Sequence, residues 1–303
     1  MKILNFGSLN IDHVYHVDHF VKPGETIPAR SFELFPGGKG LNQSVALAKA
    51  GAAVYHAGKL GHDGGMLKEI LEKSGVNTDY LESTDEVSGH AIIQVSNTGE
   101  NSIIIYGGSN RTITGEYVDR VLGDFGPDDM VLMQNEINCI DYIARKCYEK
   151  GMKIAFNPSP LDEGLLKTFP FELVTLFLVN EIEGHGLTGK SEPDEILDAF
   201  MEKYPDSAVV LTLGSRGAVY RDRHTTYCHG TYEVKVVDTT AAGDTFTGYF
   251  LSSLSSGLGI PECLKRASAA SSLAVSRKGA SSSIPTPVEV DEALKTLKYK
   301  EFK

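Results

Sequence analysis

The sequence feature that most constrains the fold is a repeated alternation of short apolar segments with helical patterns, beginning near residue 115. Polar residues or glycine follow the last apolar position of each segment. The segments are Met130–Gln134, Ile154–Asn157, Leu176–Val179 and Ala208–Leu213. Strands that alternate with helices are typical of a parallel sheet, and such sheets bind ligands beyond the carboxyl ends of their strands. The pattern therefore predicts an α/β fold with its ligand groups along one edge of the sheet.

Length and charge narrow the class of protein. A chain of 303 residues with 41% hydrophobic residues can form one large α/β domain or two smaller ones. The net charge of −11 argues against a nucleic-acid partner, which requires a basic face. It does not argue against a nucleotide, for which backbone amides and a few cations suffice. We therefore expect small-molecule ligands and no nucleic acid.

The cysteines and the apolar runs bear on location. The four cysteines form no CxxC pair, so we expect free thiols in a reducing cytosol. No apolar run approaches the length of a membrane span, and the first residues are typical of a strand and not of a signal peptide. We therefore expect a cytoplasmic protein without a membrane partner.

The segment from Val234 to Gly248 predicts a strand, a tight turn and a helix. It opens with the β-branched run Val234–Val237, continues with small residues, and becomes apolar at helical spacing after Asp244. Small residues allow backbone amides to approach a ligand, and the start of a helix favours an anion. Asp244 is then either a catalytic base at an anion site or only the N-cap of an ordinary helix.

A second candidate site lies near the N-terminus. Asn10 and Asp12 follow an apolar strand at Ile3–Leu9, where they either bind a ligand or form a turn. A glycine-rich segment at residues 36–43 precedes a helix predicted over Ser44–Lys49, and its glycines allow a small ligand to approach the backbone. The histidines at 13, 16 and 19 are three residues apart, which places neighbours on opposite faces of a strand. We therefore do not expect a metal site there.

Additional strands lie outside the main alternation. Residues 14–35 alternate around a Pro-Gly-Glu turn at 23–25, and Ala91–Ser96 and Ser102–Tyr106 are predicted to form a hairpin around residues 97–100. Residues 107–110 would return the chain to the core. At the other end, residues 285–303 are typical of a charged final helix. Four such strands would form a separate small sheet.

Two motifs about 200 residues apart resemble the signatures of a known family. GGKGLNQ at residues 37–43 and AAGDTFTG at residues 241–248 are similar to the N-terminal and C-terminal signatures of the ribokinase-like (PfkB) carbohydrate kinases. The resemblance covers essentially the whole chain. It implies a three-layer α/β/α sandwich with a mainly parallel central sheet, one kinase domain over 1–303, and a β-sheet lid from approximately 13–35 and 89–107. A lid with an apolar face and open edges predicts a homodimer in which the lids pack together.

The resemblance also implies roles for individual residues. Asp244 would be the catalytic base, and the amides of Ala241, Ala242 and Gly243 would form the anion hole. The residues implied to bind the sugar, together with Asp244, are Asn10, Asp12, Gly38, Lys39, Asn42 and Glu136. Those implied to bind the nucleotide are Asn180, Glu183, Thr212, Gly214, Ser215, Gly217, Gly243 and Ser268. Those implied to bind a monovalent cation are Asp238, Thr240, Ala274, Arg277, Gly279 and Ser283. Glu183 would also position Mg²⁺ through water, the kind of shell that Mg²⁺ prefers.

Several of these residues have structural alternatives. Asn180 and Glu183 have the spacing of a capping box, and Glu136 is otherwise a solvated carboxylate. Residues 212–217 are otherwise a plain turn after a strand, and residues 274–283 a charged loop. Three positions depart from the family pattern: Thr247 replaces a common Asn, Ser268 stands where some members have His, and Asn135 replaces an apolar residue.

The implied activity is transfer of the γ-phosphoryl group of ATP to a primary hydroxyl of a sugar, with D-ribose as the first candidate and with Mg²⁺ and K⁺ as cofactors. Fructose, 2-keto-3-deoxygluconate or a nucleoside are alternative substrates. A non-catalytic sugar sensor is the alternative from another class. The presence of Asp244, Gly243, Asn180 and Glu183 argues against a sensor, because a protein that only binds sugar needs no base.

Overall fold

Nine strands form the central sheet of the computed structural model, which describes residues 1–302. The spatial order is β13-β12-β11-β10-β9-β8-β1-β4-β5. Neighbours from β11 to β5 run parallel, and β12 and β13 join antiparallel at one edge. The bounds are β1 (Ile3–Phe6), β4 (Val54–Leu60), β5 (Asn77–Ser83), β8 (Met130–Gln134), β9 (Lys153–Asn157), β10 (Leu176–Asn180), β11 (Ala208–Thr212), β12 (Ala218–Arg221) and β13 (Thr226–His229).

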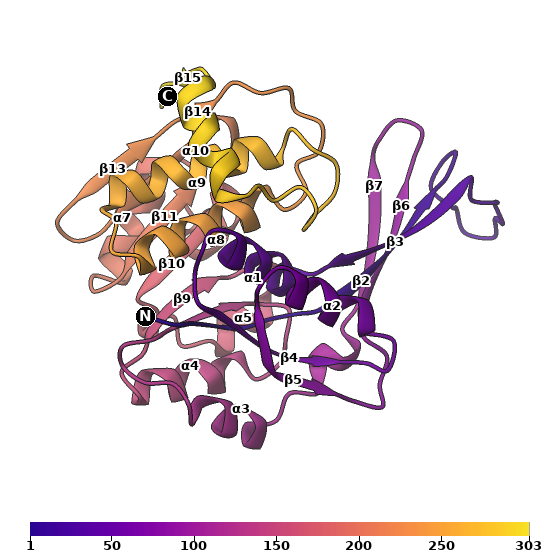
Figure 1. The fold of residues 1–303 in the computed structure, drawn as a ribbon, viewed down its shortest axis with the longest axis horizontal. Helices are drawn as coiled ribbons and strands as arrows, with labels where there is room; N and C mark the ends of the chain where they lie inside the picture. The colour runs from indigo at the N-terminus through magenta and orange to yellow at the C-terminus, as the bar shows by residue number, and fades with distance from the viewer. Residues whose placement is uncertain (303) are drawn as a thin grey trace.

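Helices cover both faces of this sheet (Figure 1). One face packs on α1 (Lys39–Lys49), α2 (Gly65–Lys73), α8 (Ala242–Ser255), α9 (Ile260–Ala274) and α10 (Pro287–Thr296). The other packs on α3 (Gly115–Leu122), α4 (Ile140–Glu149), α5 (Glu163–Thr168), α6 (Glu181–Thr188) and α7 (Pro193–Lys203). Successive strand residues point to opposite faces, so Leu132 belongs to the first core and its neighbours Val131 and Met133 to the second. The predicted three-layer α/β/α fold is confirmed.

A separate four-stranded sheet projects from the core, away from the C-terminal half of the chain (Figure 1). Its order is β3-β2-β6-β7, and its central pair, β2 with β6, is parallel. The strands are β2 (Asn10–His16), β3 (Ser31–Gly37), β6 (Gly89–Val95) and β7 (Asn101–Tyr106). We call this small sheet the lid. It begins directly after the Gly-Ser-Leu segment that follows β1, so Asn10 and Asp12 lie where the lid leaves the core.

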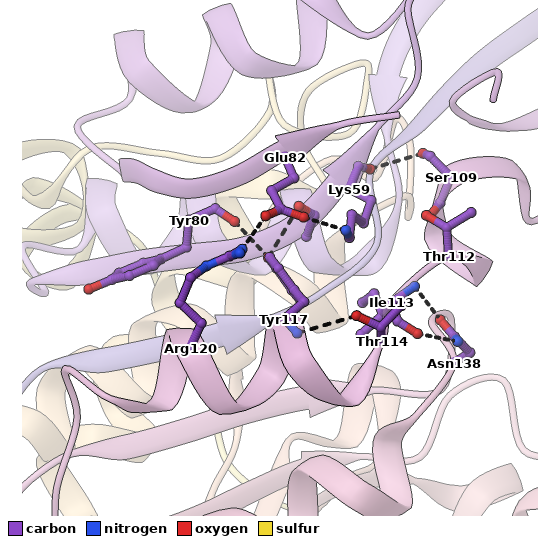
Figure 2. A network of polar contacts seen from close by, with 11 residues as sticks. Lys59, Tyr80, Glu82, Ser109, Thr112, Ile113, Thr114, Tyr117, Arg120 and Asn138 are labelled. Atoms are coloured by element: carbon purple, nitrogen blue, oxygen red, sulfur yellow. Dashed lines mark hydrogen bonds and ion pairs between the residues drawn. The ribbon is translucent and has the colours of Figure 1, made fainter. Parts of the chain in front are cut away.

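The lid returns to the core through the 3₁₀ turn η1 (Gly108–Arg111), and a polar network fixes the region beside this turn. Figure 2 shows the Glu82 carboxylate between Lys59 and Arg120, with Tyr117 beneath them. The Tyr117 hydroxyl donates to the carbonyl of Tyr80 at 2.6 Å. The hydroxyl of Ser109, in η1, donates to the Lys59 carbonyl at 2.9 Å. The lid is therefore tied to the β4–β5 edge and to α3 at its base.

Three predictions about elements were wrong. Val234–Val237 is not a strand: Val236 and Val237 are 62% and 52% exposed. The run has β propensity, but no strand in the described part of the chain pairs with it, and the Val237 amide bonds to the Val275 carbonyl instead. α1 begins at Lys39 and not at Ser44, because the chain turns through Gly38 at φ 92° and is helical directly afterwards. The final helix ends at Thr296, and β15 (Tyr299–Lys300) then pairs with β14 (Thr231–Tyr232).

The histidines at 13, 16 and 19 do not come together. The His16 ring contacts Glu33 at 3.2 Å and the His19 ring contacts Glu25 at 2.9 Å. His13 lies on the other face of the lid, with its ring centroid 5.7 Å from that of His90. Across residues 1–302, no cluster of three His, Cys, Asp or Glu side chains could hold a metal ion. In the same residues, no helix is both long and apolar enough to cross a membrane.

Candidate active site

A cleft of about 230 Å³ lies where β9, β10 and β11 end and α8 begins. Its position matches the rule that open α/β sheets bind ligands beyond the carboxyl ends of their strands. The charged side chains of its lining, together with the polar side chains at the strand ends, are Lys39, Glu183, Asp244, Asn157, Asn180 and Thr212. The cleft therefore brings together residues of the N-terminal motif, of the middle strands and of the C-terminal motif.

The start of α8 forms one wall of the cleft. Ala241 adopts the left-handed conformation at φ 58°, and no side chain among residues 1–302 caps the helix. Asp244 is in the first turn, but its carboxylate does not cap the backbone, so the interpretation of Asp244 as an N-cap does not describe this structure. Among the amides expected to form the anion hole, that of Ala242 donates to the Thr239 carbonyl at 3.2 Å. An uncapped helix start of this kind attracts anions.

The carboxylate of Asp244 is buried and held by two amides from α1. Asn42 Nδ2 donates to Oδ2 at 3.1 Å, and Gln43 Nε2 donates to Oδ1 at 2.9 Å. The two helices can lie this close because Gly248 faces Ala46, and a Cβ at position 248 would overlap the Ala46 side chain. The geometry thus presents an oriented carboxylate beside the cleft, with α1 as its support.

A second carboxylate lies near the base of the lid. Asp12 packs against Gly37, where any side chain would overlap its carboxylate. Burial raises the pKa of Asp12 to about 7, and the nearby Glu136 contributes in the same direction. A partly buried carboxylate of this kind is well suited to accept hydrogen bonds from ligand hydroxyl groups.

Glu136 links this region to the start of α1. Its carboxylate accepts a hydrogen bond from the Ser8 hydroxyl, and its Oε2 atom accepts one from the Lys39 amide at 3.0 Å. Burial raises the pKa of Glu136, although the positive charge of Lys39 and the Ser8 hydroxyl oppose this. Glu136 is therefore not the freely solvated side chain of the alternative interpretation.

Lys39 is the cation of the cleft. Burial alone would lower the pKa of Lys39, but three carboxylates outweigh that effect and raise it. They belong to Asp244, Glu136 and Glu183. The ammonium group therefore stays charged at the place where an anionic ligand would enter.

Two buried asparagines differ in how their amides are satisfied. Asn10 Oδ1 accepts a hydrogen bond from Asn110 Nδ2 at 2.7 Å. Asn42 donates to Asp244, but its own Oδ1 atom is buried without a hydrogen-bond partner among residues 1–302. A buried acceptor without a partner is costly, so this atom suits a ligand hydroxyl group.

Asn110 was not among the predicted site residues, and the only signal for it was its place at the end of the Gly-Gly-Ser turn.

Asn180 and Glu183 form the capping box of α6 and also line the cleft. Asn180 Oδ1 accepts from the Glu183 amide at 2.9 Å, and Glu183 Oε2 accepts from the Asn180 amide at 3.0 Å. The cap is therefore present, and it fixes both side chains in the lining of the cleft. Thr212 ends β11 beside them.

The remaining residues predicted to bind nucleotide lie at two places. Gly214 and Ser215 belong to a 3₁₀ turn after β11, and Gly217 follows at φ 113°. A Cβ at Gly217 would overlap the His229 carbonyl. Ser268 is buried in α9 with a hydroxyl that has no partner in the described chain, and it does not line the cleft.

The segment proposed to bind a monovalent cation is organised around Asp238. Its Oδ1 atom accepts hydrogen bonds from the Thr240 amide at 2.9 Å and hydroxyl at 2.6 Å, and Oδ2 accepts from the Gly279 amide at 3.0 Å. Burial alone would raise the pKa of Asp238, but these hydrogen bonds lower it. The structure therefore brings residues 238–240 and 279 together around one ionised carboxylate.

The other members of this set are less directly placed. Ser283 is fully buried, and its hydroxyl donates to the Ala280 carbonyl at 2.8 Å. Arg277 pairs with Glu289 at 2.7 Å, while its amide donates to the Ala274 carbonyl at 3.1 Å. Oxygen atoms are abundant in this loop, as a hard cation requires.

Three kinds of comparison place the chain among known proteins. The sequence profile described as pfkB family carbohydrate kinase matches residues 1–287. A ribokinase of Haemophilus influenzae is 34% identical over 298 residues, which span 95% of this chain and 96% of that protein. A ribokinase of Bacillus subtilis is 36% identical over 293 residues, with 95% and 97% covered.

Solved structures agree with these relatives. A Thermotoga maritima ribokinase superposes with a TM-score of 0.86 at 33% identity, covering 98% of this chain and 100% of that one. An Arabidopsis thaliana ribokinase solved with ribose and ATP has a TM-score of 0.85 at 31% identity, covering 97% and 98%. The similarity therefore extends over the cleft, the lid and the sheet together.

Proposed function

Because the chain belongs to the pfkB family of carbohydrate kinases, we propose that it phosphorylates D-ribose on its primary hydroxyl group with ATP as the phosphoryl donor. The observation that carries the proposal is the buried Asp244 carboxylate, held by Asn42 and Gln43 beside the uncapped start of α8. A base and an anion-attracting helix start are two of the parts that phosphoryl transfer to a hydroxyl uses. The ribose and ATP of the Arabidopsis structure support this substrate pair.

In the proposed reaction, Asp244 accepts the proton of the sugar hydroxyl while that oxygen bonds to the γ-phosphorus. The bond from the γ-phosphorus to the bridging oxygen breaks, and ADP leaves. The amides at the start of α8, with Lys39 nearby, stabilise the charge on the transferring group. Asp12 and the unpartnered Oδ1 of Asn42 accept hydrogen bonds from other sugar hydroxyls and so orient the ring.

The cleft also suits a magnesium-bound nucleotide. Glu183 lines it with an acidic side chain fixed by the capping box, and we propose that it holds Mg²⁺ through water. Mg²⁺ supplies neutralisation of the phosphate charge when it is bound. Gly214, Ser215 and Gly217 would flank the adenosine part, since they follow β11 at the same edge of the sheet.

The test of the proposed function is an ADP-release assay coupled to a panel of acceptors. We expect the highest kcat/KM for D-ribose, with fructose, 2-keto-3-deoxygluconate and a nucleoside lower. A higher value for another acceptor would transfer the assignment to that substrate. If the sugars bind in calorimetry but no acceptor releases ADP, a sugar sensor replaces the kinase.

We also propose that Asp238 and the 274–283 loop bind K⁺ and thereby order the adjacent start of α8. Activity in Na⁺ or Tris should then rise when K⁺ is added, and Asp238→Ala should abolish that response. Asp222→Ala is the matched control, because Asp222 also accepts loop amides but lies in the β12–β13 hairpin. Activity independent of K⁺ over the millimolar range would remove the cation site.

The lid supports a proposal about assembly. Apolar side chains are exposed on its strands, with Ile104 at 63% and Ile105 at 60%, and β7 has a free edge. We propose a homodimer in which the lid of one protomer packs on the lid of its partner. Light scattering at micromolar concentration should give about twice the mass of one 32.8 kDa chain. The double variant Ile104→Glu/Ile105→Glu should dissociate it.

Tyr148→Glu is the matched control for that variant, because Tyr148 is similarly exposed at 61% but lies on α4, in the core domain. A mass near that of one chain for the parent protein would contradict the dimer.

We propose a cytoplasmic location as well. The four cysteines are all free, as a reducing compartment requires.

A further inference from the structure

A connected set of buried polar side chains runs behind Asp244, and no step of the proposed reaction gives them a role. It passes from α8 to Gln43 on α1, to Gln134 at the end of β8 and to Asn5 on β1. We infer that Gln43 is a positioning residue for Asp244, which fixes the direction in which the carboxylate faces the sugar hydroxyl. The inference rests on the proposed function, since it concerns how the base of that reaction is held.

Each amide in this connected set has only one orientation that avoids facing two donors or two acceptors toward each other, and Gln134 Oε1 is left without a partner among residues 1–302. Asn5 Nδ2 donates to the Gly40 carbonyl at 2.8 Å, which can only accept, so Asn5 Oδ1 must face Gln134. Gln134 Nε2 then donates to Asn5 Oδ1 at 3.0 Å and to Gln43 Oε1 at 2.7 Å. Gln43 must therefore present its NH₂ group to Asp244 Oδ1. The Gly40 carbonyl on α1 thus determines, through Asn5 and Gln134, that Gln43 turns its NH₂ group toward Asp244.

The hydrogen-bonded side chains at the Asn5 end of this set, farthest from Asp244, are fixed as well. Asn5 Nδ2 donates to the Ser44 hydroxyl at 2.8 Å, and Ser44 lies 2.8 Å from His56 Nδ1. The other ring nitrogen of His56 faces the Gly7 carbonyl at 3.2 Å, so it carries the proton. Burial lowers the pKa of His56 to about 4, so the ring stays neutral. These side chains are fully buried, and solvent cannot replace any of their bonds.

Gln43 donates two hydrogen bonds from its Nε2 atom near the cleft. Besides Asp244 Oδ1, its Nε2 atom reaches Asn157 Oδ1 at 3.2 Å, and Asn157 lines the cleft. Asn42, the other support of Asp244, has no partner for its Oδ1 atom among residues 1–302, so its contact with Asp244 is the only hydrogen bond that orients its amide there. Gln43 is held at both ends of its amide, because its Oε1 atom also accepts from Gln134. Of the two amides, Gln43 therefore gives Asp244 its fixed direction.

Two substitutions of similar size test this inference. Gln43→Met removes the donor, so kcat should fall about tenfold to a hundredfold, the cost of a displaced reacting group. KM for the sugar and for ATP should stay within about threefold, since a positioning role acts mainly in the transition state. Gln43→Glu places a second carboxylate against Asp244. The pair then shares a proton, and the midpoint of the kcat–pH profile should move upward by about one unit or more.

Asn138→Leu is the control for loss of a hydrogen-bonded, partly buried amide away from Asp244. The Asn138 side chain accepts a hydrogen bond from the Ile113 amide and donates one to the Ile113 carbonyl. It is not one of the hydrogen-bonded side chains behind Asp244. Its loss should lower the melting temperature but leave the pH profile in place. The charged neighbours of Asp244, Lys39 and Glu136, are unchanged in every variant, so they cannot produce the shift. If circular dichroism shows that neither Gln43 variant folds, Gln134→Leu tests the inference instead. It removes the donor that orients Gln43.

The outcomes separate the inference from the proposed function. If the parent protein releases no ADP with any acceptor, the proposed function fails, and the inference fails with it. If the parent protein is active and folded Gln43 variants keep its kcat and its pH midpoint, the inference alone is overturned. A fall in kcat without a change of either KM, together with the upward pH shift of Gln43→Glu, supports it.

Discussion

Asp244→Asn should lower kcat by about two to four orders of magnitude, the usual contribution of a general base. The substitution keeps the size of the side chain but removes its ability to accept a proton. The fold should survive, because Gln43 can donate to the new side-chain oxygen and Asn42 can turn its unpartnered Oδ1 atom toward the new NH₂ group. KM for sugar and ATP should change only modestly. Steady-state kinetics and a thermal melt of the same preparation measure both effects.

A variant that keeps most of its kcat would mean that Asp244 is not the base. Asp12 and Glu136 would then be tested in its place, because they are the other carboxylates near the proposed sugar position. A variant that unfolds would show that the charge of Asp244 is needed to join α1 to α8.

Asp12→Ala should raise KM for the sugar by roughly ten- to 150-fold, which corresponds to the loss of about 1.5–3 kcal/mol from a hydrogen bond to a charged group. KM for ATP should stay nearly unchanged, because Asp12 lies at the base of the lid and not in the cleft lined by Asn180 and Thr212. An equal loss for both substrates would place Asp12 outside the sugar site.

The pH dependence gives the Asp12 prediction a second measurement. Sugar hydroxyls donate best to the ionised carboxylate, and the pKa of Asp12 without ligand is about 7. Binding should therefore weaken as pH falls through that value, and KM for the sugar should rise roughly tenfold between pH 8 and pH 6. Asp12→Asn should remove this dependence while the response of KM for ATP stays the same. A parent protein with a flat profile would show that Asp12 does not titrate in this range.

The sequence predicted strands β8 to β11 of the sheet well, because they are short, continuous and apolar on both sides, whereas β5, β12 and β13 were not predicted. Met130–Gln134 was predicted to the residue, and β9, β10 and β11 to within one residue at either end. The same reasoning failed at Val234–Val237, because β propensity describes a side chain and not the presence of a neighbouring strand. It also placed the start of α1 too late, because three glycines among residues 37–40 concealed a helix that begins at Lys39.

The site was only partly predictable for a different reason. Family resemblance pointed to Asn42 and Asp244, but no pattern could indicate that their side chains bond at 3.1 Å. The roles of Gln43, Gln134 and Asn5 could not be predicted, because their bonds join distant parts of the chain and each residue alone is an ordinary amide. The predicted roles of the cleft residues remain predictions, which the substitutions above test.

The close contact of α1 and α8 has a consequence for how the protein is made. Asn42 and Asp244 are 202 residues apart, so the two halves of the candidate site leave the ribosome at opposite ends of synthesis. Until α8 emerges, the apolar surface around Ala46 that will receive Gly248 has no cover. Such long-range contacts form late and slow the folding of a domain. Catalytic competence is thus acquired in one of the last steps of folding, and a nascent chain that stalls before residue 242 would carry an exposed, aggregation-prone groove instead of an enzyme.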